Sequence, residues 1–385
     1  PGSTMTYSPL NGDPLSTGVT SANFTCSLPS EGLKNGNSLP VVYGHGLLGS
    51  ADEAASTLVQ HTAATNNSVY CSTDIIGLSE ADTTSAAAAL ADISKFPSIP
   101  DRLQQAMLNT MFLGRLLTNL DGLGSAKEFQ TSAGANMLNN AQAFYDGNSQ
   151  GAIFGGAVTA VSNQWTKATL GVGGMNYSTL LDRSVDFNKF LPILEKSYPS
   201  SVDQQLVFGV IQMLWDRGET SGYVQHLTDR AYDRTPKHQV LMTVGFGDHQ
   251  VANITTQNIA RTLGIKMYQP ALPIGATIVP EPFYGIDPIP SFPYSGSALF
   301  FWDSGTLAPP LGNITPIMSQ RYIADCTGAN ADQVDSPRCA DPHEDPRRQP
   351  GVIEQKKEFF TPEGAIIDPC DDQPCIAKPA DEFDY

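Results

Sequence analysis

The chain has 385 residues, with 22 Lys and Arg against 39 Asp and Glu, which gives a formal charge of −17 at pH 7. This charge repels nucleic-acid phosphates and anionic lipid head groups, so it argues against nucleic-acid binding and electrostatic membrane attachment. No apolar run approaches the length of about 18 residues that crosses a bilayer, so no stable membrane insertion is expected.

Predicted strands and helices alternate along most of the chain. Residues 1–37 are predicted to form loops and short edge strands. Strands are then predicted at 39–43, 68–76, 143–146, 168–173, 239–245 and 298–302. Helices are predicted at 51–61, 86–93, 102–120, 152–162 and 256–263, and 178–232 is mostly helical. This alternation predicts an α/β fold, with a mainly parallel sheet flanked by helices on both faces.

Three segments extend this pattern, and we interpret residues 1–385 as a single enlarged domain. Residues 178–235 are predicted to form a helical cap insertion, and 267–292 form an apolar, Pro-rich segment. Residues 306–385 are predicted to be a loop-rich C-terminal extension containing disulfides. In the helix at 102–120, one apolar face is expected from Leu103, Met107, Leu108, Phe112 and Leu116.

Six cysteines suit a disulfide framework, although six allow fifteen connectivities. Short separations in loop-like sequence favour two pairs, and the remaining two cysteines then form the third: Cys326–Cys339, Cys370–Cys375 and Cys26–Cys71. The alternative is six reduced thiols in a cytosolic protein. The loop positions and the lack of paired C-x-x-C spacing favour an oxidising compartment, so a secreted, extracellular or periplasmic protein is expected. No signal-peptide pattern is present at the start, so we expect a processed chain.

The sharpest motif is a predicted strand followed by Gly147-Asn148-Ser149-Gln150-Gly151 and a helix of small residues. A tight turn between strand and helix needs glycine on each side of a serine whose hydroxyl projects above the sheet. We therefore predict that Ser149 is a nucleophile. The alternative is an ordinary serine in a glycine-rich turn.

A second glycine-rich turn, Gly44-His45-Gly46-Leu47, follows the strand at 39–43. Acyl transfer needs preorganised backbone N–H groups for the oxyanion, and we predict that the amides of Leu47 and Gln150 form this oxyanion hole. For His45, a buried, loop-stabilising histidine is favoured over a catalytic one.

An acid and a base are also predicted from position. Asp248 directly follows the strong strand at 239–245 and is the predicted acid, with Asp303 as the alternative. His343 is the only histidine after the last predicted strand, and prolines flank its loop, so we predict it as the base, with His249 as the competitor. Four cysteines surround this loop, which suggests that disulfides hold it in place.

These motifs together resemble the α/β-hydrolase superfamily, and within it the serine esterase and lipase branch. The resemblance covers roughly residues 38–345 and rests on the two glycine-rich turns and on Gly247-Asp248-His249-Gln250-Val251. It implies a serine, acid and histidine triad in that chain order. The Pro-rich segment and the Cys-rich tail are not standard parts of that fold.

The expected function is a secreted serine hydrolase that cleaves carboxylic esters, of small molecules or polymers, through an acyl-enzyme. The apolar segment 267–292 is expected to line an acyl pocket, with core packing as the alternative role of its aromatic residues Tyr268, Phe283, Tyr284 and Phe292. A serine peptidase or amidase with the same triad and a catalytically silent binding protein remain alternatives. No metal or cofactor motif is found, and a monomer is expected.

Overall fold

The computed structural model describes residues 1–327 and 337–385, so residues 328–336 of the predicted tail lie outside it. Within the described ranges nine strands form one sheet in the order β1-β3-β2-β4-β5-β6-β8-β7, with β9 paired to β8. The strands are β1 (Phe24–Ser27), β2 (Leu39–Gly44), β3 (Ser68–Thr73), β4 (Ala143–Asn148), β5 (Trp165–Gly171), β6 (Gln239–Gly245), β7 (Lys266–Met267), β8 (Ala298–Asp303) and β9 (Cys375–Ile376). β1 runs antiparallel to β3 and the other pairs are parallel, which confirms the mainly parallel sheet.

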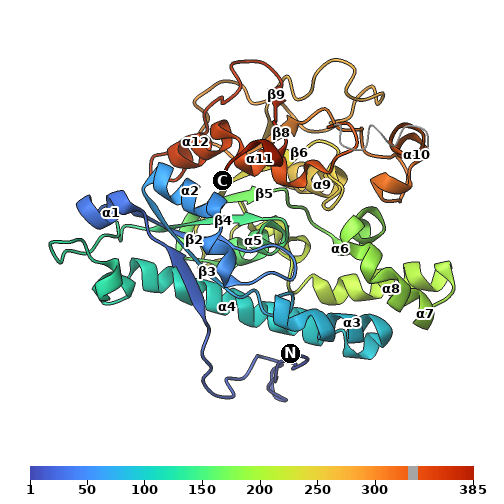
Figure 1. Cartoon of the computed structure of the whole chain (residues 1–385). Helices are drawn as coiled ribbons and strands as arrows, with labels where there is room; N and C mark the ends of the chain where they lie inside the picture. The colour runs from blue at the N-terminus through green and yellow to red at the C-terminus, as the bar shows by residue number, and fades with distance from the viewer. Residues whose placement is uncertain (328–336) are drawn as a thin grey trace.

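Helices cover both faces of this sheet (Figure 1). They are α1 (Ser30–Asn35), α2 (Thr57–Asn66), α3 (Thr83–Ala91), α4 (Ser98–Thr118), α5 (Gln150–Val161), α6 (Tyr177–Leu180), α7 (Leu191–Ser197), α8 (Ser201–Trp215), α9 (Asn253–Leu263), α10 (Gln320–Cys326), α11 (Asp345–Arg348) and α12 (Pro350–Phe359). α4 and α5 pack on one face, while α2 and α12 pack on the other.

Every residue of β3, β4 and β8 is buried because both faces of the sheet are covered. In β2, Val41 and Tyr43 join the core beneath α2 and α12, whereas Val42 joins the core beneath α4 and α5. Neighbouring residues of a strand point to opposite faces, so an unbroken apolar run satisfies both layers.

α4 forms where a helix was predicted, but the predicted apolar face is wrong. Leu103 and Met107 are buried, whereas Leu108, Phe112 and Leu116 are 44%, 54% and 42% exposed. Each residue advances about 100° around a helix, so Leu108 and the residues that follow it at intervals of four lie on a separate stripe. The buried side is completed instead by Ala106, Thr110, Leu113 and Leu117.

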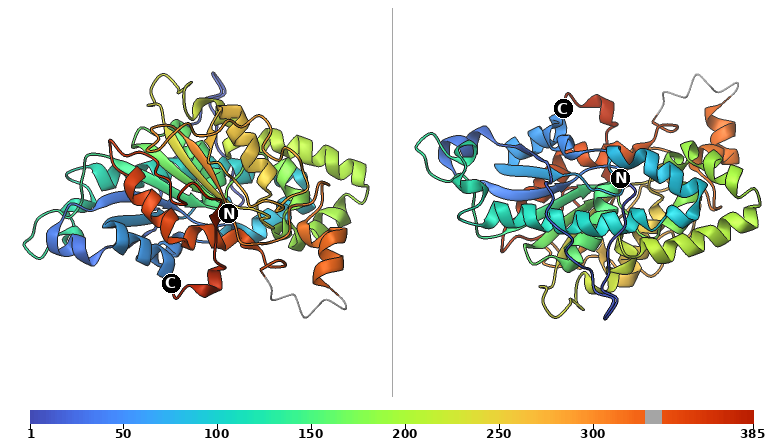
Figure 2. Two further views of the ribbon diagram at one scale, coloured as in Figure 1. Left: turned by 90° about the horizontal axis from the view of Figure 1, so that it is seen from above. Right: turned by 90° about the horizontal axis from the view of Figure 1, so that it is seen from below.

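The segment between β5 and β6 contains α6, α7 and α8, in agreement with the helices predicted there. Figure 2 shows from two opposite sides that α7 and α8 (light green) lie at the same side of the molecule as α10 (orange). Among the described residues, no helix is both long and apolar enough to cross a membrane.

The C-terminal segment is more regular than the loop-rich extension that was predicted. It contributes α12 to one face of the sheet and β9 to the strand β8. The helical pattern of α12 is weak because its buried residues include Gln355 and Lys356 next to Val352 and Phe359.

Three disulfides have the predicted connectivity, and no free cysteine remains in the described part of the chain. Cys26–Cys71 joins the edge strand β1 to β3, where the two residues are directly paired. Cys326–Cys339 and Cys370–Cys375 each close a short loop in the C-terminal segment.

Candidate active site

Ser149 lies in the sharp turn between β4 and α5. Its backbone has φ of 58° and ψ of −124°, a strained conformation for a residue with a side chain. A side-chain carbon at Gly147 would overlap the carbonyl oxygen of Gly151, and one at Gly151 would overlap that of Gly44. Both glycines of the motif are therefore required by the close approach of α5 to the strands.

The predicted acid and base are in direct contact. Asp248 follows β6, and its Oδ2 accepts a hydrogen bond of 2.8 Å from Nδ1 of His343. Its Oδ1 accepts backbone N–H bonds from Gln250 (2.8 Å) and Val251 (2.9 Å), which fix the carboxylate. Ser149 thus follows β4, Asp248 follows β6 and His343 follows β8 in a mainly parallel sheet covered by helices. This is the α/β-hydrolase fold.

The two ring nitrogens of His343 differ in their contacts, and only Nδ1 is bound, by Asp248, among the described residues. Nε2 is buried and has no hydrogen-bond partner among the described residues. Ser149 and His343 line the same cavity of about 330 Å³, although no hydrogen bond joins the two side chains in the described part of the chain. Burial alone lowers the pKa of the imidazole, but the charge and hydrogen bond of Asp248 outweigh burial, and the pKa lies above the ordinary value of 6.5.

Asp341, which was not predicted, connects the acid loop to the histidine loop. Its Oδ1 accepts the backbone N–H groups of His249 and His343, each at 3.1 Å. Its Oδ2 accepts a bond of 3.0 Å from Nε2 of Gln250. The usable sequence signal was Asp341 before Pro342, because Asp followed by Pro is typical of the start of a helix.

The other candidate residues lie apart from this contact. Nδ1 of His45 is 2.8 Å from the carbonyl oxygen of Gly46, and Nε2 accepts the N–H of Ile75 at 2.8 Å, so His45 stabilises its loop as favoured above. His249 presents its ring edge-on to Tyr322, at 5.9 Å between centroids. Asp303 accepts the N–H of Gly305 at 2.8 Å.

The residues predicted for the oxyanion hole lie beside Ser149. Leu47 and Gln150 line a second cavity together with Ser149. Gln150 is the first residue of α5, so its N–H has no acceptor within the helix. The loop that carries Leu47 is held by Glu53, whose Oε2 accepts the N–H of Gly46 at 2.8 Å.

This second cavity has a volume of about 90 Å³ and mostly apolar walls. They come from the loop after β2, from α3 and α4 and from residues 177–190, and they include Leu47, Leu90, Ile99, Leu181, Phe187 and Phe190. No residue of 267–292 lines it, so the predicted acyl wall is wrong. Instead Tyr268 stacks on Phe300 at 5.1 Å between ring centroids, because β7 and the chain that follows it pack along β8 at the sheet edge.

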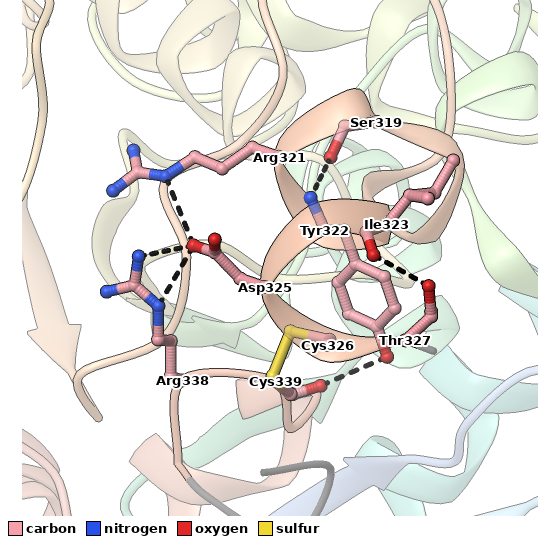
Figure 3. The surroundings of a disulfide bond; sticks show 9 residues. All are labelled: Ser319, Arg321, Tyr322, Ile323, Asp325, Cys326, Thr327, Arg338 and Cys339. Atoms are coloured by element: carbon pink, nitrogen blue, oxygen red, sulfur yellow. Dashed lines mark hydrogen bonds and ion pairs between the residues drawn. A yellow bond between two sulfur atoms is a disulfide. The ribbon is translucent and has the colours of Figure 1, made fainter. Parts of the chain in front are cut away.

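α10 supports the histidine loop through a disulfide (Figure 3). Cys326 at the end of α10 is bonded to Cys339, four residues before His343. The hydroxyl of Tyr322 donates to the carbonyl oxygen of Cys339 at 3.4 Å. The loop is therefore tied both covalently and by a hydrogen bond to one short helix.

Comparisons with known proteins give only solved structures of low sequence identity. No protein-family model and no curated protein matches the chain. The acetyl xylan esterase 1 of Thermoanaerobacterium sp. JW/SL YS485 is 13% identical, with a TM-score of 0.42 over 63% of this chain and 69% of that protein.

Two further solved structures are similar. An acylaminoacyl peptidase of Pyrococcus horikoshii is 11% identical with a TM-score of 0.44, and the match spans 90% of this chain but 40% of the peptidase. A monoacylglycerol lipase of Paleococcus ferrophilus is 10% identical with a TM-score of 0.37 over 74% of this chain and 89% of that protein.

Proposed function

We propose that the protein is a serine hydrolase that cleaves carboxylic esters. The observation that carries this proposal is that Ser149, in the sharp turn after β4, and the buried imidazole of His343 line the same cavity. Asp248 holds one nitrogen of His343 at 2.8 Å, and the other nitrogen has no partner among residues 1–327 and 337–385. An imidazole oriented in this way is suited to take a proton from the Ser149 hydroxyl.

In the proposed mechanism, His343 accepts the Ser149 proton as Oγ attacks the ester carbonyl carbon. The backbone N–H groups of Leu47 and Gln150 stabilise the tetrahedral oxyanion. When the carbon–oxygen bond to the alcohol breaks, His343 donates the proton to the leaving oxygen. Water then attacks the acyl-enzyme and gives a proton to His343. The bond between the acyl carbon and Ser149 Oγ breaks as His343 returns that proton to Oγ, the carboxylic acid is released, and Asp248 stabilises each imidazolium.

The surroundings of the site support further proposals about the ester class and the compartment of the protein. Apolar walls near Ser149 favour esters with an apolar acyl part, of either a small molecule or a polymer. Three disulfides favour an oxidising compartment, so the proposed enzyme is extracellular or periplasmic. We further propose one domain over residues 1–385 with a cap at 178–235, acting as a monomer without metal or cofactor.

The test is the variant Ser149→Ala. Hydrolysis of p-nitrophenyl butyrate should fall by about 10⁴-fold or more, because the attacking oxygen is lost. A fluorophosphonate probe should label the wild-type protein on the peptide that contains Ser149, and mass spectrometry of the digest reads the site.

Ser201→Ala is the matched control, because Ser201 is an exposed serine at the start of α8 and lines neither cavity. It should keep wild-type activity and labelling. Undiminished hydrolysis by a folded Ser149→Ala protein would refute the nucleophile, and a wild-type protein that resists the probe would favour a silent binding protein. Faster cleavage of a matched butyramide than of the ester would favour an amidase.

A further inference from the structure

Two cavities of different character meet at Ser149. Four residues line both of them: Leu47, Ser149, Asp186 and Gln250. The smaller cavity, of about 90 Å³, is called the apolar cavity here. The larger, of about 330 Å³, is called the polar cavity. An ester bound at Ser149 therefore has a separate space for each side of its scissile bond.

The proton transfer in the proposed mechanism determines which side of the ester occupies which cavity. The leaving alcohol must receive a proton from His343, and His343 lines the polar cavity but not the apolar one. The carbonyl oxygen must meet the amides of Leu47 and Gln150, and Gln150 lines the apolar cavity but not the polar one. The acyl chain therefore belongs in the apolar cavity and the alcohol in the polar cavity.

The volume of the apolar cavity limits the acyl chain. A cavity of about 150 Å³ in a protein core holds one benzene ring. By proportion, the apolar cavity of about 90 Å³ takes about four carbon atoms. Phe187 and Phe190 contribute to its walls from the segment between β5 and β6. A short acyl chain fits this space better than the long chain of a lipid.

The polar cavity is charged but balanced. Its lining residues include three carboxylates and three cations, which are Glu53, Asp186, Glu344, Lys189, Arg347 and Arg348. Such a lining favours a neutral group with many hydrogen-bonding atoms over a charged group or an alkyl chain.

Arg347 supplies unused donors on this side. Its side chain is 8% exposed, and Nη1 pairs with Oε1 of Glu344 at 3.3 Å. Nε and Nη2 are buried without a partner in the described part of the chain. Buried donors of this kind are costly unless an acceptor oxygen reaches them, and a hydroxylated alcohol carries such oxygens.

We propose that the substrate is an ester of a short apolar acid with a neutral, polyhydroxylated alcohol, and that Arg347 is a specificity-determining residue on the alcohol side. The proposal rests on the ester hydrolase function above and adds the substrate class to it.

The wild-type protein tests this class with two butyrate esters that share the acyl chain. 1-Butyrylglycerol and pentyl butyrate have alcohols of the same heavy-atom count, and only the first carries free hydroxyls. We expect kcat/KM for 1-butyrylglycerol to be at least about tenfold higher. We also expect 1-decanoylglycerol to be at least about tenfold poorer than 1-butyrylglycerol. Equal rates on the two butyrates, or a better rate on pentyl butyrate or on the decanoyl ester, would overturn the inference.

Two variants separate the cavities. Arg347→Met should lower the preference for 1-butyrylglycerol by about tenfold while pentyl butyrate is still cleaved. Phe190→Ala, which changes only the apolar cavity, should improve the decanoyl ester and leave the alcohol preference as in wild type. If Arg347→Met fails to fold, the wild-type comparison and the variant Lys189→Met, at an exposed residue of the polar cavity, still test the alcohol preference. An enzyme that cleaves no ester and is not labelled at Ser149 would instead refute the proposed function.

Discussion

The state of charge of His343 depends on one carboxylate. The imidazole is 2% exposed, and such burial disfavours the imidazolium, yet Asp248 holds its Nδ1 at 2.8 Å and favours the charged form. The effect of Asp248 outweighs that of burial, so the pKa of His343 is raised above its usual value. The proposed base therefore binds its proton more tightly than a free histidine does.

A raised pKa predicts the acid limb of the activity profile. Only neutral His343 accepts the Ser149 proton, so activity is present above its pKa and is lost as the pH falls through that value. We expect the acid limb of kcat/KM to have its midpoint above 6.5, the ordinary histidine value. Initial rates on a neutral butyrate ester between pH 5 and 9 measure it, and a midpoint well below 6.5 would contradict the assigned contact.

Asp248→Asn should move that limb as well as slow the enzyme. Without the carboxylate, burial dominates and lowers the pKa of His343, so the midpoint shifts to lower pH. The rate should fall by about 10⁴-fold, since an asparagine does not stabilise the imidazolium. Asp303→Asn is the matched control. No hydrogen bond or ion pair joins Asp303 to a histidine within the described residues, and it binds the N–H of Gly305 instead, so the limb should stay in place.

At the scale of elements, α12 is fastened to β4, the strand that leads into Ser149. Nζ of Lys356 lies 2.7 Å from Oδ2 of Asp146 in β4, and both side chains are buried. Asp146 also accepts hydrogen bonds from the hydroxyls of Tyr70 (3.2 Å) and Thr169 (2.6 Å). This polar group inside an otherwise apolar layer joins three strands and one helix.

Lys356→Met should destabilise the protein strongly, because it leaves the Asp146 charge buried without its partner. We expect a loss of about 3–5 kcal/mol in the free energy of unfolding, measured by urea titration followed by circular dichroism. Lys357→Met on the exposed side of the same helix is the control and should change stability by less than about 0.5 kcal/mol. A similar small loss in both variants would show that the ion pair is dispensable.

Strands and helices were predictable where their apolar residues alone indicate which positions are buried, without reference to distant parts of the chain. The strand at 239–245 was predicted with the bounds that β6 has, because every residue after Gln239 is buried. α12 was missed because Lys356 faces the core, which makes sense only once Asp146 is known to lie opposite it. The residues proposed for catalysis were predicted from local motifs and chain order. Asp341 acts on a loop 92 residues away, and its Asp-Pro signal indicates only the start of a helical turn.

At the scale of the whole molecule, the three disulfides constrain the unfolded chain to different degrees. Their sequence separations are 45 for Cys26–Cys71, 13 for Cys326–Cys339 and 5 for Cys370–Cys375. Loop-closure entropy then predicts contributions of about 4, 3 and 2 kcal/mol, in that order.

Replacing each pair by serines and measuring urea unfolding tests this order. The Cys326/Cys339 variant should also lose activity under native conditions, because its loop leads into His343, whereas the Cys370/Cys375 variant serves as the control with its activity kept. A larger loss of stability from the shortest loop than from the longest would contradict the entropic account.

Long-range packing also explains the wrong acyl wall. The segment 267–292 is apolar, as a pocket lining would be, but its direction is set by the pairing of β7 with β8. Phe283 packs against Phe301 of β8, with ring centroids 4.7 Å apart. Composition alone does not distinguish an apolar segment that covers a sheet edge from one that lines a cavity.

The order of the proposed catalytic residues along the chain has a consequence for biosynthesis. Ser149, Asp248 and every strand through β8 leave the ribosome before His343 does. In the proposed mechanism, Ser149 has no base until that histidine docks at the strand ends, so the growing chain would be inert toward the esters of the cell that makes it. On the proposed mechanism, hydrolytic activity therefore begins only after His343 has been synthesised and has docked.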